Sequence, residues 1–470
     1  MKYVSTRGHV EPIEFTDAVL MGLADDGGLL LPESIPDARD SLENWPGLPY
    51  NELAFQVLRL YATDVPERDL KTLIDRSYGE TFDGGVAPTI RLGRPRAAAG
   101  GDLFILELWH GPTMSFKDVA LQFLGNLFEY ALNKHGSRMN ILAATSGDTG
   151  SAAICGARGR RGIHIFVMHP HKRVSPIQER QMTTVLDDNV HNIAIKGSFD
   201  DCQRIMKTLA ADLDFKRKYS LGAVNSVNWA RVLAQMVYYF AGAFDVQRLT
   251  GAEKLRFCVP TGNFGDILAG WYAMQMGAPI SQLILATNEN DILSRFFNTG
   301  VYSLGAVHHT LSPAMDIQVA SNFERYLYYK VGCDAAGLSR LMAEFSQTGS
   351  LQIEPDRSGL VDPAVAAGMG SKQQCLETIR KYYEQYGYLL DPHTAVGVAV
   401  AESQGLAGEP VICLATAHPA KFPDAIKQAT GMDLAHHPKI DALKNLPTRC
   451  EVLPNDKEAL RRFIIDTIGH

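Results

Sequence analysis

The segment that decides the fold is residues 110–118, with the sequence His-Gly-Pro-Thr-Met-Ser-Phe-Lys-Asp. An apolar run of strand length precedes it at residues 104–108, and residues 115–132 follow it with apolar side chains at helical spacing. Lys117 therefore falls in the first turn of a helix that follows a strand. This arrangement is typical of an α/β fold, and it places an amine where the chain turns.

Lys117 occupies an electrostatically unfavourable position. Ser115 and Asp118 have the spacing of a capping box, so the sequence predicts that the helix begins there. Unpaired backbone N–H groups make the first turn of a helix positive, and such a field lowers the pKa of an amine. A neutral amine is the form that attacks an aldehyde. The alternative is an ordinary exposed lysine whose ammonium group reaches solvent past the helix end.

Two glycine-rich turns bear on this choice. Residues 145–150 have the sequence Thr-Ser-Gly-Asp-Thr-Gly, residues 260–266 have the sequence Pro-Thr-Gly-Asn-Phe-Gly-Asp, and each turn lies between an apolar strand and a helix. Backbone amides at such helix starts can hold anions, although either turn could also be a tight connection without a ligand. Neither turn is a Walker A loop or a G-x-G-x-x-G fingerprint.

A lysine amine together with two anion sites is the set of groups that an enzyme using pyridoxal 5'-phosphate needs. The lysine would carry the cofactor aldehyde, one turn the cofactor phosphate, and the other the carboxylate of an amino acid. Asp148 is awkward in the first turn, because its charge would repel an anion unless it caps the helix or bonds to a cofactor hydroxyl. The three features together favour this hypothesis more than any one of them does.

Short apolar runs alternate with helical stretches along most of the chain. Further strands are expected at residues 140–144, 163–168, 191–195, 255–259, 283–286 and 411–415. Because these runs are apolar throughout, the sequence predicts a parallel sheet covered on both faces. The first ninety or so residues are helix-leaning, residues 299–370 are less regular, and the tail after residue 431 looks peripheral.

The bulk composition argues against several classes of protein. The 470 residues are 46% hydrophobic and 21% charged, which is a globular composition with room for two or three domains. A net charge of -7 argues against a large nucleic-acid surface. The 7 cysteines include no C-x-x-C pair and the paired histidines lack metal-ligand spacing, so no disulfide framework or metal site is expected. Without an apolar signal core or a membrane-spanning run, the expected location is the cytoplasm.

Motifs over nearly the whole chain resemble those of the threonine synthases, a family of fold-type II pyridoxal-phosphate enzymes. The matching segments are residues 22–29, 110–113, 116–118, 145–150, 225–228, 262–266, 286–288 and 416–422. Their combination separates this family from the dehydratases and cysteine synthases that share the fold. Met114 and Ser115 depart mildly from the pattern, without touching the reactive amine.

The resemblance implies two parallel-type sheets flanked by helices, similar to the β subunit of tryptophan synthase, with a helical N-terminal extension. The expected parts are the N-terminal helical extension (1–95), a smaller mobile domain for cofactor and substrate (96–245), a larger α/β domain with the cofactor-phosphate loop (246–430) and a C-terminal tail (431–470). We expect the smaller domain to close over the substrate.

The resemblance also implies roles for individual residues. Lys117 bonds to the aldehyde of pyridoxal 5'-phosphate, and Thr416 faces the pyridine nitrogen, unless it is a strand-end residue bonded only to backbone. The cofactor phosphate is held by Gly262, Asn263, Phe264 and Gly265, and Asp266 also belongs to the cofactor-binding residues. The substrate is received by Thr145, Ser146, Gly147, Asp148, Thr149, Asn225, Asn228 and Arg231.

The implied reaction converts O-phospho-L-homoserine and water into L-threonine and phosphate, the last step of threonine biosynthesis. Lys117 would remove the Cα proton and then a Cβ proton. The substrate phosphate needs a second anion pocket, for which the candidates are Lys172, Arg173, Asn225, Asn228, Arg231 and Lys421. His418 is either a proton relay or a histidine held by backbone contacts.

Three alternatives to this function follow from the same residues. The chain could be a serine or threonine dehydratase, an anion- or nucleotide-binding module in which the lysine has no covalent role, or an inactive scaffold. The expected partner is a small-molecule substrate, with no nucleic acid and no membrane, in a monomer or homodimer.

Overall fold

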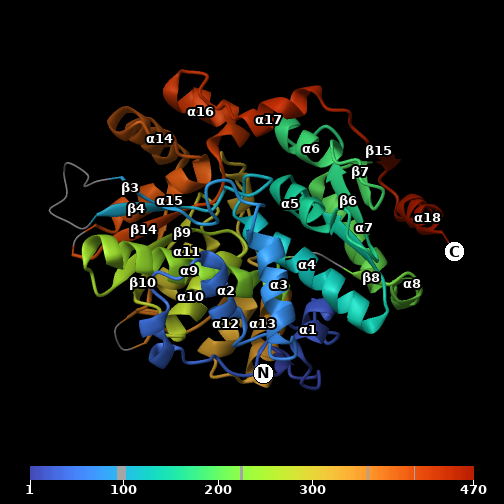
Figure 1. Cartoon of the computed structure of the whole chain (residues 1–470), viewed down its shortest axis with the longest axis horizontal. Helices are drawn as coiled ribbons and strands as arrows, with labels where there is room; N and C mark the ends of the chain where they lie inside the picture. Colours follow the sequence, from blue (N-terminus) through green and yellow to red (C-terminus); the bar gives the residue numbers. More distant parts are fainter. Residues whose placement is uncertain (93–101, 223–225, 357–358, 407, 470) are drawn as a thin grey trace.

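The computed structural model describes residues 1–92, 102–222, 226–356, 359–406 and 408–469. Figure 1 shows two open sheets on opposite sides of the molecule, with a helical layer between them and the N-terminal helices packed against that layer. One sheet has six strands in the order β13-β10-β9-β14-β4-β3, and the other has five in the order β15-β7-β6-β5-β8.

In the six-stranded sheet, neighbours are parallel except at the β3 edge, where β3 pairs antiparallel with β4. Its strands are β3 (Thr89–Arg91), β4 (Leu103–Glu107), β9 (Leu255–Pro260), β10 (Ile280–Thr287), β13 (Val365–Met369) and β14 (Val411–Ala415). The helices around it are α9 (Trp229–Thr250), α10 (Gly265–Gln275), α11 (Ile292–Thr299), α14 (Lys372–Tyr386), α15 (Pro392–Ser403) and α16 (Pro423–Thr430).

The five-stranded sheet is parallel throughout. Its strands are β5 (Met139–Ala144), β6 (Ile163–Pro170), β7 (Val190–Lys196), β8 (Leu221–Gly222) and β15 (Glu451–Pro454). The helices packed around it are α5 (Asp148–Ala157), α6 (Pro176–Thr183), α7 (Phe199–Ala211), α8 (Leu213–Lys218) and α18 (Lys457–Ile468). Helix α4 (Lys117–His135) joins the sheets, because it packs on α5 and on α9.

The N-terminal part forms a small layer over α4 and α9. It contains β1 (Tyr3–Ser5), α1 (Phe15–Met21), β2 (Leu30–Pro32), the 3-10 helix η1 (Arg39–Asn44), α2 (Tyr50–Leu58) and α3 (Glu67–Tyr78). Its aromatic side chains pack on Trp229 of α9, with ring centroids of Tyr3 and Tyr61 at 6.1 Å and 5.8 Å from that of Trp229. This buried contact ties the extension to the main body.

The remaining elements lie mostly between residues 299 and 370 and in the C-terminal part. They are β11 (Val301–Ser303), η2 (Pro313–Met315), α12 (Phe323–Lys330), α13 (Ala335–Thr348), β12 (Ser350–Gln352), η3 (Pro419–Lys421), α17 (Pro438–Ala442) and η4 (Leu443–Asn445). In the part of the chain that the structure describes, no helix is both long and apolar enough to span a bilayer.

The predicted α/β class, the two parallel-type sheets and the helical N-terminal extension are confirmed. Two placements differ. Strand β4 was grouped with the smaller domain but pairs with β14 in the six-stranded sheet. The C-terminal tail is not peripheral. Strand β15 pairs with β7, and Leu460 and Ile464 of α18 are buried in the apolar core that covers the five-stranded sheet.

The expected capping box at Ser115 forms only in part. Helix α4 begins at Lys117 after Phe116, and the Ser115 hydroxyl accepts the Lys117 N–H at 3.5 Å rather than the Asp118 N–H. The Asp118 carboxylate accepts the Ser115 N–H at 3.5 Å, as in a capping box, but its closer contacts are the Thr113 N–H at 2.8 Å and the Thr113 hydroxyl at 2.6 Å. Asp118 therefore mainly stabilises the turn before the helix.

Candidate active site

A pocket lies where parallel strands of both sheets end, at the carboxyl edge that α/β proteins commonly use for ligands. The turns after β4, β5, β9 and β14 all reach it, and it encloses about 750 Å³, part of which is open to solvent. Its lining residues are Phe116, Lys117, Asp148, Thr149, Ser226, Arg231, Val232, Gln235, Pro260, Thr261, Gly262, Asn263, Phe264, Gly265, Asp266, Ala314, Met315, His393, Thr416 and Ala417.

Lys117 points into this pocket and is only 8% exposed, which removes the alternative of an ordinary surface lysine. Burial lowers its pKa to about 8, and the positive charges of Lys421 and Arg231 act in the same direction. Asp148 opposes them by favouring the ammonium form. The net result is an amine that is partly neutral near physiological pH.

The turn after β9 forms a cradle of backbone amides at the start of α10. Phe264 adopts a left-handed conformation with φ 63°, a strained state for a non-glycine residue, and α10 begins at Gly265. The neighbouring Asn322 holds this shape, because its backbone N–H and its side-chain amide donate to the Asn263 carbonyl at 3.0 Å and 3.2 Å. A fixed cradle at a helix start suits a phosphate group.

Asp266 lies in the first turn of α10 and borders the pocket. Tyr238 and Tyr239 donate hydroxyl hydrogen bonds to one carboxylate oxygen, at 2.5 Å and 2.9 Å. The other oxygen is buried and has no hydrogen-bond partner among the described residues. Burial raises the pKa of Asp266 to about 6, although both tyrosines oppose this shift.

The turn after β5 is held by its own side chains. The Thr145 hydroxyl accepts N–H groups of Gly147 at 3.0 Å and Gly150 at 2.9 Å. Asp148 forms an ion pair of 2.7 Å with Lys421, which lies in η3, the short 3-10 helix after β14 of the six-stranded sheet. Burial alone would raise the pKa of Asp148, but Lys421 and Lys117 together hold it well below its usual range. The paired carboxylate no longer presents a free negative charge to an anion.

Arg231, in the first turn of α9, is buried at 4% exposure and borders the pocket. Its Nε and Nη1 atoms have no hydrogen-bond partner among the described residues, and burial is the one influence on its pKa, with no acidic neighbour acting against it. Burial lowers its pKa to about 10, which leaves it protonated at neutral pH. A buried guanidinium without an acid is costly, so this group is suited to a ligand anion.

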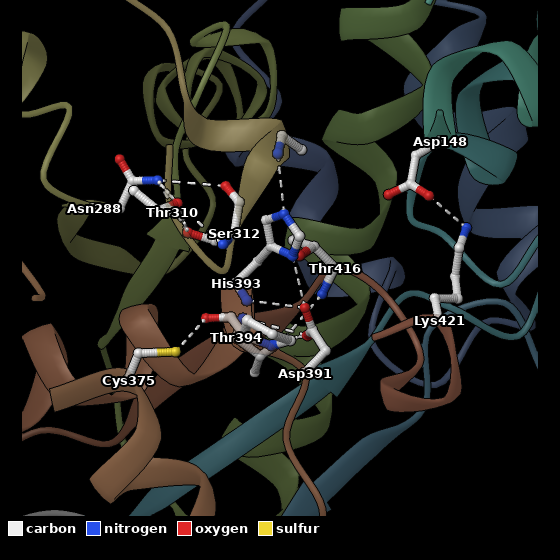
Figure 2. A network of polar contacts seen from close by, with 12 residues as sticks. Asp148, Asn288, Thr310, Ser312, Cys375, Asp391, His393, Thr394, Thr416 and Lys421 are labelled. Atoms are coloured by element: carbon white, nitrogen blue, oxygen red, sulfur yellow. Dashed lines mark hydrogen bonds and ion pairs between the residues drawn. The ribbon is translucent and has the colours of Figure 1, made fainter. Parts of the chain in front are cut away.

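Thr416 follows β14 and borders the pocket, and its backbone N–H donates to the Thr394 hydroxyl at 3.3 Å. Figure 2 shows the buried network behind it, in which Asp391 contacts both His393 and Thr394. His393 also borders the pocket, and it was missed from the sequence. The signal was present as Asp391-Pro392, an acidic cap and a proline at a helix start, with histidine in the next position.

The structure brings together most but not all of the expected site residues. Those that line the pocket are Lys117, Asp148, Thr149, Arg231, Gly262, Asn263, Phe264, Gly265, Asp266 and Thr416. Thr145, Ser146, Gly147 and Asn228 are not among the lining residues. The Asn228 side chain caps α9 by accepting the Ala230 N–H and donates to the Val19 carbonyl. Asn225 lies outside the described residues.

The other candidates for the substrate phosphate are placed differently. Lys172 and Arg173 are exposed on the surface, and Lys421 is engaged by Asp148 and by the Thr113 carbonyl at 2.8 Å. His418 accepts the Ala420 N–H at 3.1 Å, and burial lowers its pKa to about 4. These contacts fit a histidine held by backbone rather than a proton relay. Of the candidates that the structure describes, Arg231 is the one that borders the pocket and is buried with guanidinium nitrogens lacking a hydrogen-bond partner.

Known proteins match this chain from end to end. Family models for the threonine synthase N terminus, for pyridoxal-phosphate-dependent enzymes and for the threonine synthase C-terminal region match residues 2–78, 81–370 and 394–464. A threonine synthase of Pseudomonas aeruginosa is 46% identical, over 99% of this chain and 98% of its own. The chain belongs to the threonine synthase family.

Solved structures of this family have the same fold. A pyridoxal-phosphate-bound threonine synthase of Brucella melitensis is 42% identical and superposes with a TM-score of 0.93, covering 99% of both chains. The threonine synthase from yeast is 40% identical with a TM-score of 0.91, covering 99% of this chain and 98% of its own. The fold and family expected from the motifs are therefore confirmed, and the chain is a pyridoxal-phosphate-dependent enzyme.

The residues of the pocket fit pyridoxal 5'-phosphate. A buried amine with a lowered pKa faces the same space as a backbone cradle at a helix start. A side-chain carbon on Gly262 would lie 2.5 Å from the Ala314 carbonyl oxygen, so the cradle is shaped around a glycine. Buried polar atoms of Asp266 and Arg231 lack protein partners, as expected for groups that meet a ligand.

Proposed function

We propose that this chain catalyses the conversion of O-phospho-L-homoserine and water to L-threonine and phosphate. The observation that carries the proposal is the pairing, in one pocket, of a partly neutral lysine with two separate places for anions, the glycine cradle and Arg231. A cofactor phosphate needs one such place, and a phosphorylated substrate needs the other. A dehydratase acting on serine or threonine would need no second phosphate site.

Gly262, Asn263, Phe264 and Gly265 would hold the cofactor phosphate, Lys117 would bond to the cofactor aldehyde, and Thr416 would face the pyridine nitrogen. When bound, the cofactor supplies an electron-withdrawing ring that makes the protons at the substrate's Cα and Cβ removable. A neutral threonine hydroxyl, unlike a carboxylate, does not hold a proton on the ring nitrogen.

Lys117 would act as the base once the substrate amine has displaced it from the aldehyde. Its lowered pKa would let it take the Cα proton, pass that proton on so that it is neutral again, take a second proton from Cβ, and return one to Cγ as phosphate leaves. Water would then add its hydroxyl at Cβ and give its proton to the released phosphate, and Cα would regain a proton to complete threonine. The proton transfers involve three consecutive carbons of one short chain, so a single flexible amine could serve as the base for each of them.

The substrate would be fixed at both ends. Thr149, at the start of α5, would receive its carboxylate, while Arg231 would receive its phosphate through charge-assisted hydrogen bonds. Asp148 is held away from this carboxylate by Lys421 and by the Gln178 side-chain amide, which donates to it at 2.8 Å. The ion pair thus keeps an acidic residue from repelling an acidic substrate.

We further propose that the smaller domain, which carries the turn after β5, closes over the bound substrate, and that the enzyme works in the cytoplasm as a monomer or homodimer without nucleic acid. The Asp148–Lys421 ion pair supports the closure, because it links the turn of the five-stranded sheet to a turn that follows the six-stranded sheet. Comparing structures with and without substrate tests it, and an unchanged separation of the sheets would contradict it.

The test of the function is spectroscopic and kinetic. The purified protein with cofactor is expected to show a visible imine absorbance that borohydride removes, with the adduct on the peptide containing Lys117. Phosphate and threonine should appear in equal amounts from O-phospho-L-homoserine. Rapid ketoacid formation from serine or threonine, without phosphate release, would support the dehydratase instead.

The lowered pKa of Lys117 predicts the pH dependence of cofactor capture. With a pKa of about 8, about a tenth of the amine is neutral at pH 7, against less than about a thousandth for an unperturbed lysine. Because the pKa is lowered, raising the pH through 8 converts ammonium to amine. The rate at which the cofactor-free protein forms the imine band should therefore rise up to about pH 8 and then level off. A rate that keeps rising beyond pH 10 would contradict the lowered pKa.

A substitution at Gly262 tests the cradle. In the Gly262→Ala variant the new Cβ would lie 2.5 Å from a backbone oxygen, so the turn must shift. We expect the cofactor affinity to fall about tenfold or more, in the range of overpacked sites. The matched control is Gly305→Ala, whose nearest atoms lie at an ordinary 3.6 Å and 3.8 Å. Equal affinities in the two variants, measured by titration of the visible band, would argue against the cradle.

A further inference from the structure

Asp391 is a carboxylate with 1% exposure at the start of α15, and each of its oxygens serves a different neighbour. One oxygen accepts from the His393 ring Nδ1 at 2.8 Å and from the His393 backbone N–H at 3.0 Å. The other accepts the Thr394 hydroxyl and, at 3.3 Å, the Thr394 backbone N–H. The two backbone contacts are those of an ordinary helix cap, but the two side-chain contacts are additional.

His393 has both ring nitrogens engaged, and Figure 2 shows its contact with Asp391. The Ala314 backbone N–H, which can only donate, points to Nε2 at 3.2 Å. Nε2 is therefore the acceptor and Nδ1 carries the proton that Asp391 accepts, so the ring is neutral in this arrangement. His393 faces the pocket without a free nitrogen to exchange protons with a substrate. Its contacts fit a residue that holds structure, not an acid or base.

The segment that His393 holds is the short turn η2, which contains Ala314 and Met315. This turn lines the pocket and presses on the phosphate cradle, since the Ala314 carbonyl oxygen would lie 2.5 Å from a Cβ on Gly262. On its other flank, the Asn288 amide donates to the Ser312 hydroxyl at 3.0 Å and to Asp316 at 2.8 Å. His393 thus supplies the pocket-side support of a turn that shapes the cradle.

Thr394 forms the second arm of the network. Its hydroxyl gives its proton to Asp391, which leaves an oxygen lone pair to accept the Thr416 N–H at 3.3 Å. Thr416 is the residue assigned above to the pyridine nitrogen. The same carboxylate therefore bears on both ends of the cofactor site, the ring end and the phosphate end.

We propose that Asp391 is a positioning residue that holds the Ala314–Met315 turn against Gly262 through His393 and fixes Thr416 through Thr394. The proposal rests on the function proposed above, because the Ala314–Met315 turn and Thr416 need to be positioned only if they border the two ends of a bound cofactor. It assigns a neutral structural role to a buried aspartate–histidine pair that otherwise resembles an acid–base dyad.

The experiment compares two substitutions of the histidine in the full-length protein. His393→Phe keeps a ring against Phe422, whose centroid lies 5.1 Å away, but removes both nitrogens. His393→Gln keeps an acceptor able to reach the Ala314 N–H and cannot act as an acid or base. Hydrogen exchange of the peptide covering residues 310–318, first without and then with cofactor, is measured beside cofactor affinity. His309→Gln, on the exposed stretch before η2, is the control.

We expect exchange of this peptide to become about fivefold faster in His393→Phe, the loss of one hydrogen bond, with a similar fall in cofactor affinity. His393→Gln should restore both properties and most of kcat. Unchanged exchange and affinity in His393→Phe would overturn the positioning role. If His393→Gln has the exchange rate of the unsubstituted protein but has lost kcat, the positioning role is overturned and His393 acts as an acid or base.

The second arm is tested with Asp391→Asn. An amide in place of the second oxygen should turn the Thr394 hydroxyl away and remove the acceptor of the Thr416 N–H. We expect a shifted visible band of the bound cofactor, whereas an unchanged band would overturn this arm. Hydrogen exchange of residues 310–318 in the cofactor-free protein does not depend on the reaction. If this exchange changes as expected in the variants while the unsubstituted protein forms no threonine, the proposed function fails and the positioning role stands.

Discussion

Replacing Lys117 by alanine is expected to lower kcat by at least about a thousandfold. The variant loses the amine that bonds to the cofactor and the base that moves every proton, while both anion sites remain. Cofactor should still bind through its phosphate, but the absorbance should be that of a free aldehyde, and borohydride should trap no adduct on the peptide containing residue 117. The measurements are steady-state phosphate release, the visible spectrum and peptide mapping.

The matched control is Lys254→Ala, which removes an exposed lysine just before β9. It should leave kcat and the spectrum unchanged. Added methylamine should partly restore turnover to Lys117→Ala, because it can enter the pocket and supply a neutral amine. Retention of more than a tenth of the activity without added amine would remove Lys117 from the mechanism.

The strands and the reactive lysine could be predicted from the sequence because their signals are local. The run at residues 411–415 is β14 to the residue, and the run at 283–286 lies within β10, from its fourth to its seventh residue. The position of Lys117 followed from the apolar side chains on its two sides, which form a strand-length run before it and recur at helical spacing after it. The glycine turns followed from their place between a strand and a helix.

What failed depends on partners that the local pattern does not indicate. Asp118 was assigned to a capping box, yet its closest contacts are with Thr113 in the turn before the helix. Lys421 was a candidate for the substrate phosphate, yet Asp148 occupies it from the opposite sheet. His393 was not singled out, because its role appears only when Ala314, 79 residues away in the chain, is placed beside it.

Two buried arginines show how the structure separates a structural cation from a binding one. Arg325 is fully buried and satisfied, since its guanidinium donates to the Leu30 carbonyl at 2.9 Å and 2.7 Å and to the Asn322 side chain at 2.6 Å. Arg231 is buried with two nitrogens unpaired. Both arginines lie in the first turn of a helix, and the accounting of hydrogen bonds is what distinguishes them.

Replacing Arg231 by methionine is therefore expected to change activity and stability in opposite directions. The substrate phosphate would lose its buried cation, so kcat/KM for O-phospho-L-homoserine should fall by about a hundredfold or more, with cofactor affinity nearly unchanged. The ligand-free protein should keep its stability or gain about 1 kcal/mol, because an unpaired buried charge is removed. Steady-state kinetics and thermal unfolding of the cofactor-free protein measure the two effects.

The contrasting substitution, Arg325→Met, should lower stability, because it strands the Leu30 and Val227 carbonyls that Arg325 now satisfies. If Arg231 were a structural cation like Arg325, both variants would unfold earlier and the loss of kcat/KM would follow the loss of folded protein. A destabilised Arg231→Met variant with an unchanged KM would therefore refute the phosphate assignment. A stable variant with a raised KM supports the phosphate assignment. The Arg231 guanidinium is buried without a partner in the free protein, and the substrate phosphate would then be that partner.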